Sequence, residues 1–297
     1  MKGASATARL IAASLVCMQR AGVARGRVPA PSLALAEAAL CADGLGLRAL
    51  RCALRFGWVR RICTAIEARL LPGIQWHYVL RKQRLHEWAM QAFAQGHTQL
   101  LILGAGLDGL GLTAAQIAAI DVVEFDHPAT QAIKRGALQR LVSSPPNLRL
   151  HALDLANGSV SNALRNARLR RDEPTLIVAE GLLMYMSQWR CRRMVIELLA
   201  WFRGPLRAAF SVMQVDKLGR AGFPQAQRGV GAWLAQRDEP FRWGCTPAAL
   251  ASTLYRLDLQ QLARHDPCSL PEPPASGWVP CPGEDMRLVE RSATRPR

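Results

Sequence analysis

The stretch from Gln99 to Lys134 constrains the fold more than any other part of this 297-residue sequence. It begins with a continuous apolar run, Leu100 to Leu103, and such runs are typical of strands buried on both faces of a parallel sheet. The glycine-rich turn GAGLDG follows at once, and then a second expected strand, Val122 to Phe125, that ends in Asp126. This order of elements predicts the first strand–helix–strand unit of an open α/β sheet.

The glycine turn predicts a ligand-binding crevice at the carboxyl edge of that sheet. Gly104, Gly106 and Gly109 have no Cβ, so the backbone can adopt positive φ and approach a ligand closely. Asp126 follows the second strand, at a position where an acid commonly accepts hydrogen bonds from a ribose. The pattern therefore predicts a ligand that contains a nucleoside.

Two nucleoside cofactors are compatible with this turn. Its letters satisfy the dinucleotide fingerprint G-x-G-x-x-G, which favours NAD and an oxidoreductase. Asp108 argues against NAD, because a pyrophosphate bound here would meet a like charge. S-adenosylmethionine has no phosphate and has a cationic sulfonium, so it tolerates Asp108. A helix N-cap or turn-forming role for Asp108 is an equally good interpretation.

Several segments resemble the leucine carboxyl methyltransferase family. They are LLILGAGLDGL with VVEFDHPATQAIKRGAL, then HALDLAN, PTLIVAEGLLMYMS and EPFRWGCTPAALASTL, and before the first strand YVLRKQRLHEW. AEGLLMYM is the most specific of them, and the similarity extends from about Leu54 to the C-terminus. The resemblance is closest to the bacterial branch that includes polyketide-tailoring carboxyl methyltransferases. The family's usual Asp-Thr pair after the glycines is Asp108-Gly109 here.

This resemblance implies a Rossmann-like class I methyltransferase fold, with a seven-stranded, mostly parallel α/β sheet and an N-terminal helical cover. We expect residues 1–95 to form the cover and residues 96–297 the core, with a glycine-rich, irregular insertion at 214–242. The implied cofactor is S-adenosylmethionine, held against Gly104, Ala105, Gly106 and Asp126. The implied reaction is O-methylation of a carboxylate in a small molecule or a peptide.

The resemblance also assigns roles to residues outside the glycine turn. Arg81 matches the arginine that binds the methionine carboxylate of the cofactor, although a surface arginine is the alternative in so basic a chain. Asp154 and Leu155 match the pair that frames the adenine, and Asp154 is alternatively an N-cap. Glu180 matches a residue near the cofactor and is suited to hold the methionine ammonium. Tyr185 either contacts the substrate or is a buried packing residue.

No catalytic base is expected. A carboxylate acceptor is already ionised at neutral pH, so its methylation requires alignment and exclusion of water rather than proton removal. The motifs contain no histidine–aspartate dyad. We therefore name no catalytic residue.

The remaining pattern completes an alternating sheet. Pro128 to Leu141 reads as a helix that begins with proline. Further strands are expected at residues 147–153, 175–179 and 206–213, and the last two, at 259–264 and 286–290, are expected to pair antiparallel. The proline-rich stretch at 271–283 is expected to be a loop.

The net charge of +16 allows an anionic partner or a compositional bias. We prefer the bias, because the arginines are dispersed and no long basic run interleaves with aromatic residues. An RNA-directed methyltransferase or binding protein is the third hypothesis, and we expect no nucleic-acid partner.

The eight cysteines form no C-x-x-C pair and no zinc spacing, so we expect a reduced, cytoplasmic protein without a metal site. No apolar run is long enough to span a bilayer. Near the N-terminus, Leu10, Ile11, Leu15 and Met18 share a helical face, which favours an amphipathic helix over a signal peptide. The sequence does not indicate the oligomeric state.

Overall fold

The computed structural model describes residues 3–141, 145–266, 268 and 278–291. Seven strands form one sheet in the order β3-β2-β1-β4-β5-β7-β6, and every pair is parallel except the two that involve β7. The strands are β1 Gln99–Leu103, β2 Asp121–Asp126, β3 Leu148–Ala152, β4 Thr175–Ala179, β5 Leu206–Met213, β6 Leu259–His265 and β7 Glu284–Arg291. The predicted seven-stranded, mostly parallel α/β sheet is confirmed, including its antiparallel last pair.

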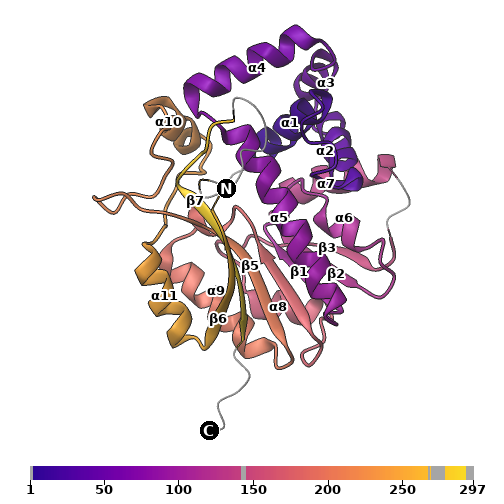
Figure 1. Ribbon diagram of the computed structural model, residues 1–297. Helices are drawn as coiled ribbons and strands as arrows, with labels where there is room; N and C mark the ends of the chain where they lie inside the picture. Colours follow the sequence, from indigo (N-terminus) through magenta and orange to yellow (C-terminus); the bar gives the residue numbers. More distant parts are fainter. Residues whose placement is uncertain (1–2, 142–144, 267, 269–277, 292–297) are drawn as a thin grey trace.

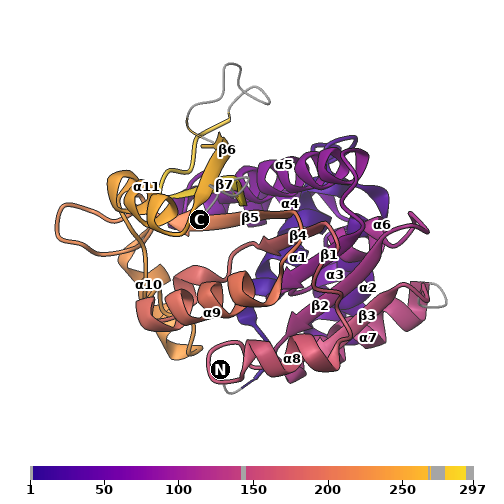
Figure 2. The same cartoon turned by 90° about the horizontal axis from the view of Figure 1, so that it is seen from below.

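The apolar run of β1 is buried on both faces, as the sequence predicts. Leu100 and Ile102 pack into one core and Leu101 and Leu103 into another, because successive side chains of a strand point to opposite faces. Figures 1 and 2 show the sheet between two helical layers. The first layer contains α1 Ala6–Arg20, α2 Ala30–Ala42, α5 Ile74–Ala94, α6 Leu110–Ala114 and α7 Pro128–Leu141, and the second contains α8 Val160–Asn166 and α9 Gln188–Trp201. Helix α11, Pro247–Arg256, packs beside the second layer against β5 and β7.

The helices before β1 include two that project from the body of the protein. They are α3 Leu45–Ala53 and α4 Gly57–Leu70, and Figure 1 shows α4 at the outer edge of the molecule. Helix α5 then runs back along the sheet toward β1. The division of the chain into a cover and a core stays a prediction.

The insertion at 214–242 is more regular than its composition indicates. It contains helix α10, Arg228–Gln236, which the sequence reading missed because Gly229 and Gly231 weaken the helical pattern. Glu239 follows this helix and is only 2% exposed. Its carboxylate accepts hydrogen bonds from the backbone N–H groups of Ala6 and Thr7, both at 3.0 Å. The insertion is thereby tied to the first turn of α1.

Within the described residues, no helix is both long and apolar enough to cross a bilayer. The expected proline-rich loop falls largely on residues 271–277, which lie outside the described part of the chain.

Candidate active site

The glycine turn follows β1 and takes the backbone conformation that its composition predicts. Gly104 has φ +67° and Gly106 has φ +53°, values that residues with a Cβ adopt rarely. The N–H of Gly104 donates to the carbonyl of Phe125 at 2.8 Å. A Cβ on Gly104 would lie 3.0 Å from the side chain of Leu182, so the turn passes close to the segment after β4.

Asp126 lies at the tip of β2 and holds the glycine turn. One carboxylate oxygen accepts from the N–H of Gly106 and the other from the N–H of His127. Burial raises the pKa of Asp126, and these backbone hydrogen bonds oppose that rise. A carboxylate has about four acceptor positions, so each oxygen keeps one for the hydroxyls of a ribose.

Asp108 forms the turn rather than the cap of the helix that follows. The N-cap of α6 is Gly109, so the N-cap interpretation of Asp108 is wrong. The Asp108 carboxylate accepts from the N–H of Gly109 at 2.7 Å and pairs with Lys82 Nζ at 3.1 Å. Helix α6 itself has only five residues. It is too short to direct a helix dipole strongly at a phosphate.

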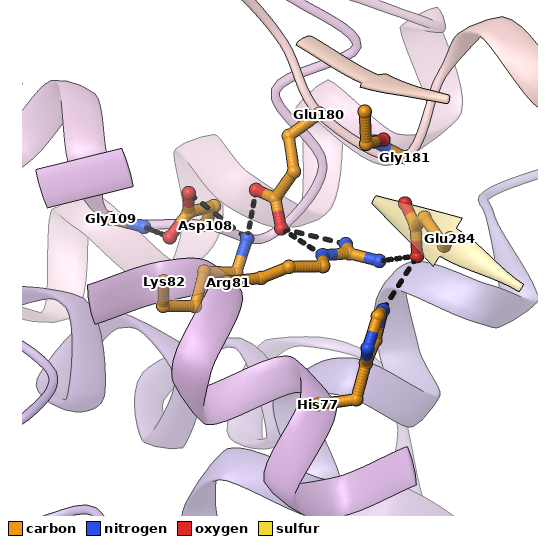
Figure 3. Close-up of polar contacts among 9 residues, drawn as sticks. His77, Arg81, Lys82, Asp108, Gly109, Glu180, Gly181 and Glu284 are labelled. Carbon is orange, nitrogen blue, oxygen red and sulfur yellow. Dashed lines mark hydrogen bonds and ion pairs between the residues drawn. The ribbon is translucent and has the colours of Figure 1, made fainter. Parts of the chain in front are cut away.

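Glu180, directly after β4, forms ion pairs with two cationic side chains of α5 (Figure 3). Arg81 Nε donates to Glu180 Oε1 at 2.8 Å, and Arg81 Nη2 lies 2.6 Å from the same oxygen. Lys82 Nζ lies 2.5 Å from Glu180 Oε2. Arg81 is buried, so the interpretation of Arg81 as a surface arginine is wrong. Gly181, with φ +60°, lets the chain turn where a Cβ would stand 3.2 Å from Arg81.

Glu284, the first residue of β7, completes this ionic cluster. Its Oε2 accepts from Arg81 Nη1 at 2.6 Å and lies 2.8 Å from His77 Nε2. The sequence reading missed Glu284 because it began the strand at Met286. The expected antiparallel pairing could have indicated this residue. An antiparallel strand begins at the edge of the sheet where the parallel strands end, and Glu284 is paired with Met213 at the end of β5. Lys82 lies within the segment YVLRKQRLHEW, but the sequence pattern does not indicate a role for it in the site.

The cluster gathers three carboxylates around two permanent cations and His77. Two cations, Arg81 and Lys82, face three carboxylates, Asp108, Glu180 and Glu284. Burial by itself raises the pKa of Glu180, but Lys82 and Arg81 outweigh burial and the pKa is lowered. Glu180 is therefore ionised at neutral pH. Three carboxylates gathered at one place in a chain of net charge +16 disfavour an anionic ligand there.

Asp154 and Leu155 follow β3 at the same edge of the sheet. The N-cap interpretation of Asp154 is wrong, because Ser159 caps α8 and accepts from the N–H of Asn162. Asp154 instead accepts from the N–H of Ala156 at 2.9 Å and from Asn157 Nδ2 at 2.8 Å. Burial raises the pKa of Asp154, but these hydrogen bonds outweigh it, so the net shift is downward.

Tyr185 lies on the short helix η1, Leu183–Tyr185, and packs between segments of the cover and the insertion. Its hydroxyl is 3.5 Å from Thr7 Oγ1, and its ring centroid is 5.7 Å from that of Phe241. Burial raises the pKa of Tyr185. These contacts agree with the packing interpretation, and a contact with substrate stays a prediction.

The predicted residues thus meet at one edge of the sheet. The glycine turn, Asp126, Asp154 and Glu180 follow β1, β2, β3 and β4, which are neighbours in the strand order. Direct contacts join Gly106 to Asp126 and Arg81 to Glu180. The ligand roles of all these residues stay predictions.

Glu284 makes the stability of the fold depend on pH. Burial raises its pKa, but Arg81 and His77 outweigh burial and hold it at about 2, below the ordinary 4.5. Because the folded-state pKa is depressed, Glu284 stabilises the fold above pH 4.5 and loses this contribution as the pH falls toward 2, about 3 kcal/mol in all. We expect Glu284→Gln to flatten the dependence of the urea midpoint on pH between about 5 and 3.

Glu290→Gln is the matched control, because Glu290 lies at the other end of β7 and its side chain is 33% exposed beside Arg207. An equally steep pH dependence in Glu284→Gln and the native chain would contradict the assignment.

The fold belongs to the class I S-adenosylmethionine-dependent methyltransferases. A solved "putative methyltransferase" from Thermobifida fusca superposes with TM-score 0.58 over 91% of this chain and 97% of its own, at 17% identity. A solved DUF574 family protein from Streptomyces avermitilis gives TM-score 0.54 over 78% and 90%, at 16% identity. At these identities the likeness shows the fold alone.

The chain belongs to the leucine carboxyl methyltransferase family, whose model matches residues 51–198. A "putative S-adenosyl-L-methionine-dependent methyltransferase" from Mycobacterium avium is 37% identical over 36% of this chain and 34% of its own length. Another, from Mycolicibacterium paratuberculosis, is 31% identical over 65% of this chain and 59% of its own length. The chain spans about a third of the first of these relatives. The family predicted from the motifs is confirmed.

Proposed function

We propose that this protein is an S-adenosylmethionine-dependent methyltransferase that methylates a carboxylate of a small molecule or a peptide. The gathering of the carboxylates of Asp108, Glu180 and Glu284 beside the glycine turn is the observation that carries the proposal. S-adenosylmethionine has a sulfonium, an ammonium and a carboxylate, and hence one net positive charge. NAD has a pyrophosphate, which these carboxylates would repel.

The residues present fit this cofactor. Gly104 and Gly106 offer bare backbone, and Asp126 keeps acceptor positions for ribose hydroxyls. Arg81 uses three N–H directions on Glu180 and Glu284, so two of the five donors of its guanidinium remain for the methionine carboxylate. Glu180 would accept from the methionine ammonium.

When bound, the cofactor supplies an electrophilic methyl group, and the chain supplies alignment and exclusion of water. The cover suits the second task. A Cβ placed on Gly106 would lie 3.5 Å from the Cβ of Ala8, so α1 lies directly over the glycine turn. A carboxylate acceptor needs no general base.

A titration by calorimetry tests the cofactor. We expect S-adenosylmethionine and its demethylated product to bind at least about tenfold more tightly than NAD, because only NAD brings phosphate charge into the crevice. A dissociation constant for S-adenosylmethionine no lower than that for NAD would favour the oxidoreductase alternative. Salt-sensitive binding of RNA in place of either would favour the RNA-directed alternative.

The acceptor is tested with methyl-labelled S-adenosylmethionine and a panel of carboxylic acids and peptides. A methyl ester releases labelled methanol in mild base, whereas an N-methyl or ether product does not. We expect base-labile label. Turnover that gives only base-stable label would retain the methyltransferase and contradict the carboxyl acceptor.

A further inference from the structure

Helix α4 leaves a row of large apolar side chains uncovered. Trp58, Ile62 and Ile66 are 64%, 50% and 52% exposed, and their spacing of four residues places them on one face. Phe56, just before the helix, and Leu70, at its end, extend the row. Figure 1 shows α4 at the periphery, away from the sheet. A contiguous apolar row of this kind marks an interaction surface.

The apolar band of α4 is wider than the part that the protein covers. Val59 and Cys63, also four residues apart, pack against the main core. Trp58, Ile62 and Ile66 lie beside them on the same helix and face solvent. The body of the protein therefore explains only one side of the band.

The surroundings of this row are strongly basic. From Leu45 to Leu70 the sequence has one acid, Glu67, and six arginines, which give a net charge of +5: Arg48, Arg51, Arg55, Arg60, Arg61 and Arg69. Arg60 donates to the carbonyls of Leu54 and Arg55, both at 2.9 Å, and carbonyls do not cancel its charge. Arg61 and Arg69 are exposed along the row.

We propose that α3 and α4 dock this protein on an anionic lipid surface, with Trp58, Ile62 and Ile66 inserted between the headgroups. A helix that joins aromatic and aliphatic residues on one face to flanking arginines is suited to lie in a bilayer interface. Each arginine near an anionic leaflet adds electrostatic attraction. The apolar row supplies insertion, and the arginines supply the preference for negative lipid.

A second copy of the chain fits this surface less well. A symmetric contact through α4 would place the same patch, of net charge +5, against itself. Arginine is common in protein interfaces, but here six arginines would face six others, with only Glu67 of each copy to pair with them. The charge thus favours lipid over self-association.

Co-sedimentation with vesicles tests the proposal on the full chain. We expect binding to vesicles of phosphatidylcholine with phosphatidylglycerol, and at least about tenfold weaker binding to phosphatidylcholine alone. The triple variant Trp58→Gln/Ile62→Gln/Ile66→Gln keeps the charge and removes the insertion. We expect it to lose at least about tenfold in affinity for the anionic vesicles.

The matched control is Trp189→Gln/Ile196→Gln on α9, which removes side chains that are 65% and 49% exposed on another helix. It should bind vesicles as the native chain does. A second variant, Arg61→Gln/Arg69→Gln, keeps the apolar row and should bind anionic vesicles more weakly, with a smaller dependence on salt. Unchanged S-adenosylmethionine affinity in each variant would show that the fold is retained.

Three results would overturn the proposal. One is no binding of the native chain to anionic vesicles, and another is equal binding by the native chain and the α4 triple variant. The third is a concentration-dependent dimer in sedimentation velocity that the triple variant abolishes, without vesicle binding. That result would assign the row to a second copy of the chain.

Discussion

Asp126→Ala is expected to weaken the binding of S-adenosylmethionine by about a hundredfold. A charge-assisted hydrogen bond contributes about 1.5–3 kcal/mol, and each 1.4 kcal/mol corresponds to about tenfold in affinity. The variant removes the acceptor for the ribose and also frees the N–H of Gly106, so the glycine turn loses its partner on β2. Calorimetric titration measures the effect.

Asp121→Ala is the matched control for this prediction. Asp121 begins the same strand, pairs with Arg149 at 2.7 Å and has a side chain that is 26% exposed. It lies at the opposite edge of the sheet from the crevice, so the affinity should change less than about twofold. Equal affinity in Asp126→Ala and the native chain would remove the ribose assignment.

Arg81→Met is expected to reduce both stability and cofactor affinity. It leaves Glu180 and Glu284 buried without their guanidinium, and removal of one partner of a buried ion pair costs about 3–5 kcal/mol. Urea unfolding measures the loss of stability. Arg84→Met, one turn away on α5, removes a side chain that is 38% exposed and pairs with Glu87, so it should cost less than about 1 kcal/mol.

A double variant separates burial from ligand binding. Arg81→Met/Glu284→Gln removes one of the two buried carboxylates that lose their partner when Arg81 is replaced. It should therefore recover part of the lost stability. It should not recover the affinity for S-adenosylmethionine, because the donors for the methionine carboxylate are still absent. Full recovery of affinity would show that Arg81 only stabilises the fold.

The sheet could be predicted closely because its signals are local. The boundaries of β4 and β5 and of helix α7 agree with the sequence reading to the residue. Pro174 and Pro205 precede the two strands, and α7 begins with Pro128. Helix α10 was missed because its glycines interrupt the helical spacing of apolar residues. The family and the fold followed from motifs that lie in the same strands and turns.

The candidate site could be predicted only where a motif marks it. Asp126 and Glu180 each follow an apolar strand, and position alone indicates them. Glu284 belongs to a strand that enters the sheet from a distant part of the chain, and its contact with Arg81 spans 203 residues. No local pattern encodes such a pairing. Lys82 was visible in the sequence, but only packing shows that it bridges Asp108 and Glu180.

The hydrogen bonds of Glu239 connect the insertion to the start of α1, which lies over the glycine turn. Because its carboxylate holds Ala6 and Thr7, any movement of the start of α1 away from Gly106 would break these hydrogen bonds. If ligand exchange requires such a movement, its rate depends on how readily these hydrogen bonds open. A transient loosening of α1, visible as faster amide exchange in its first turns, would accompany each round of turnover.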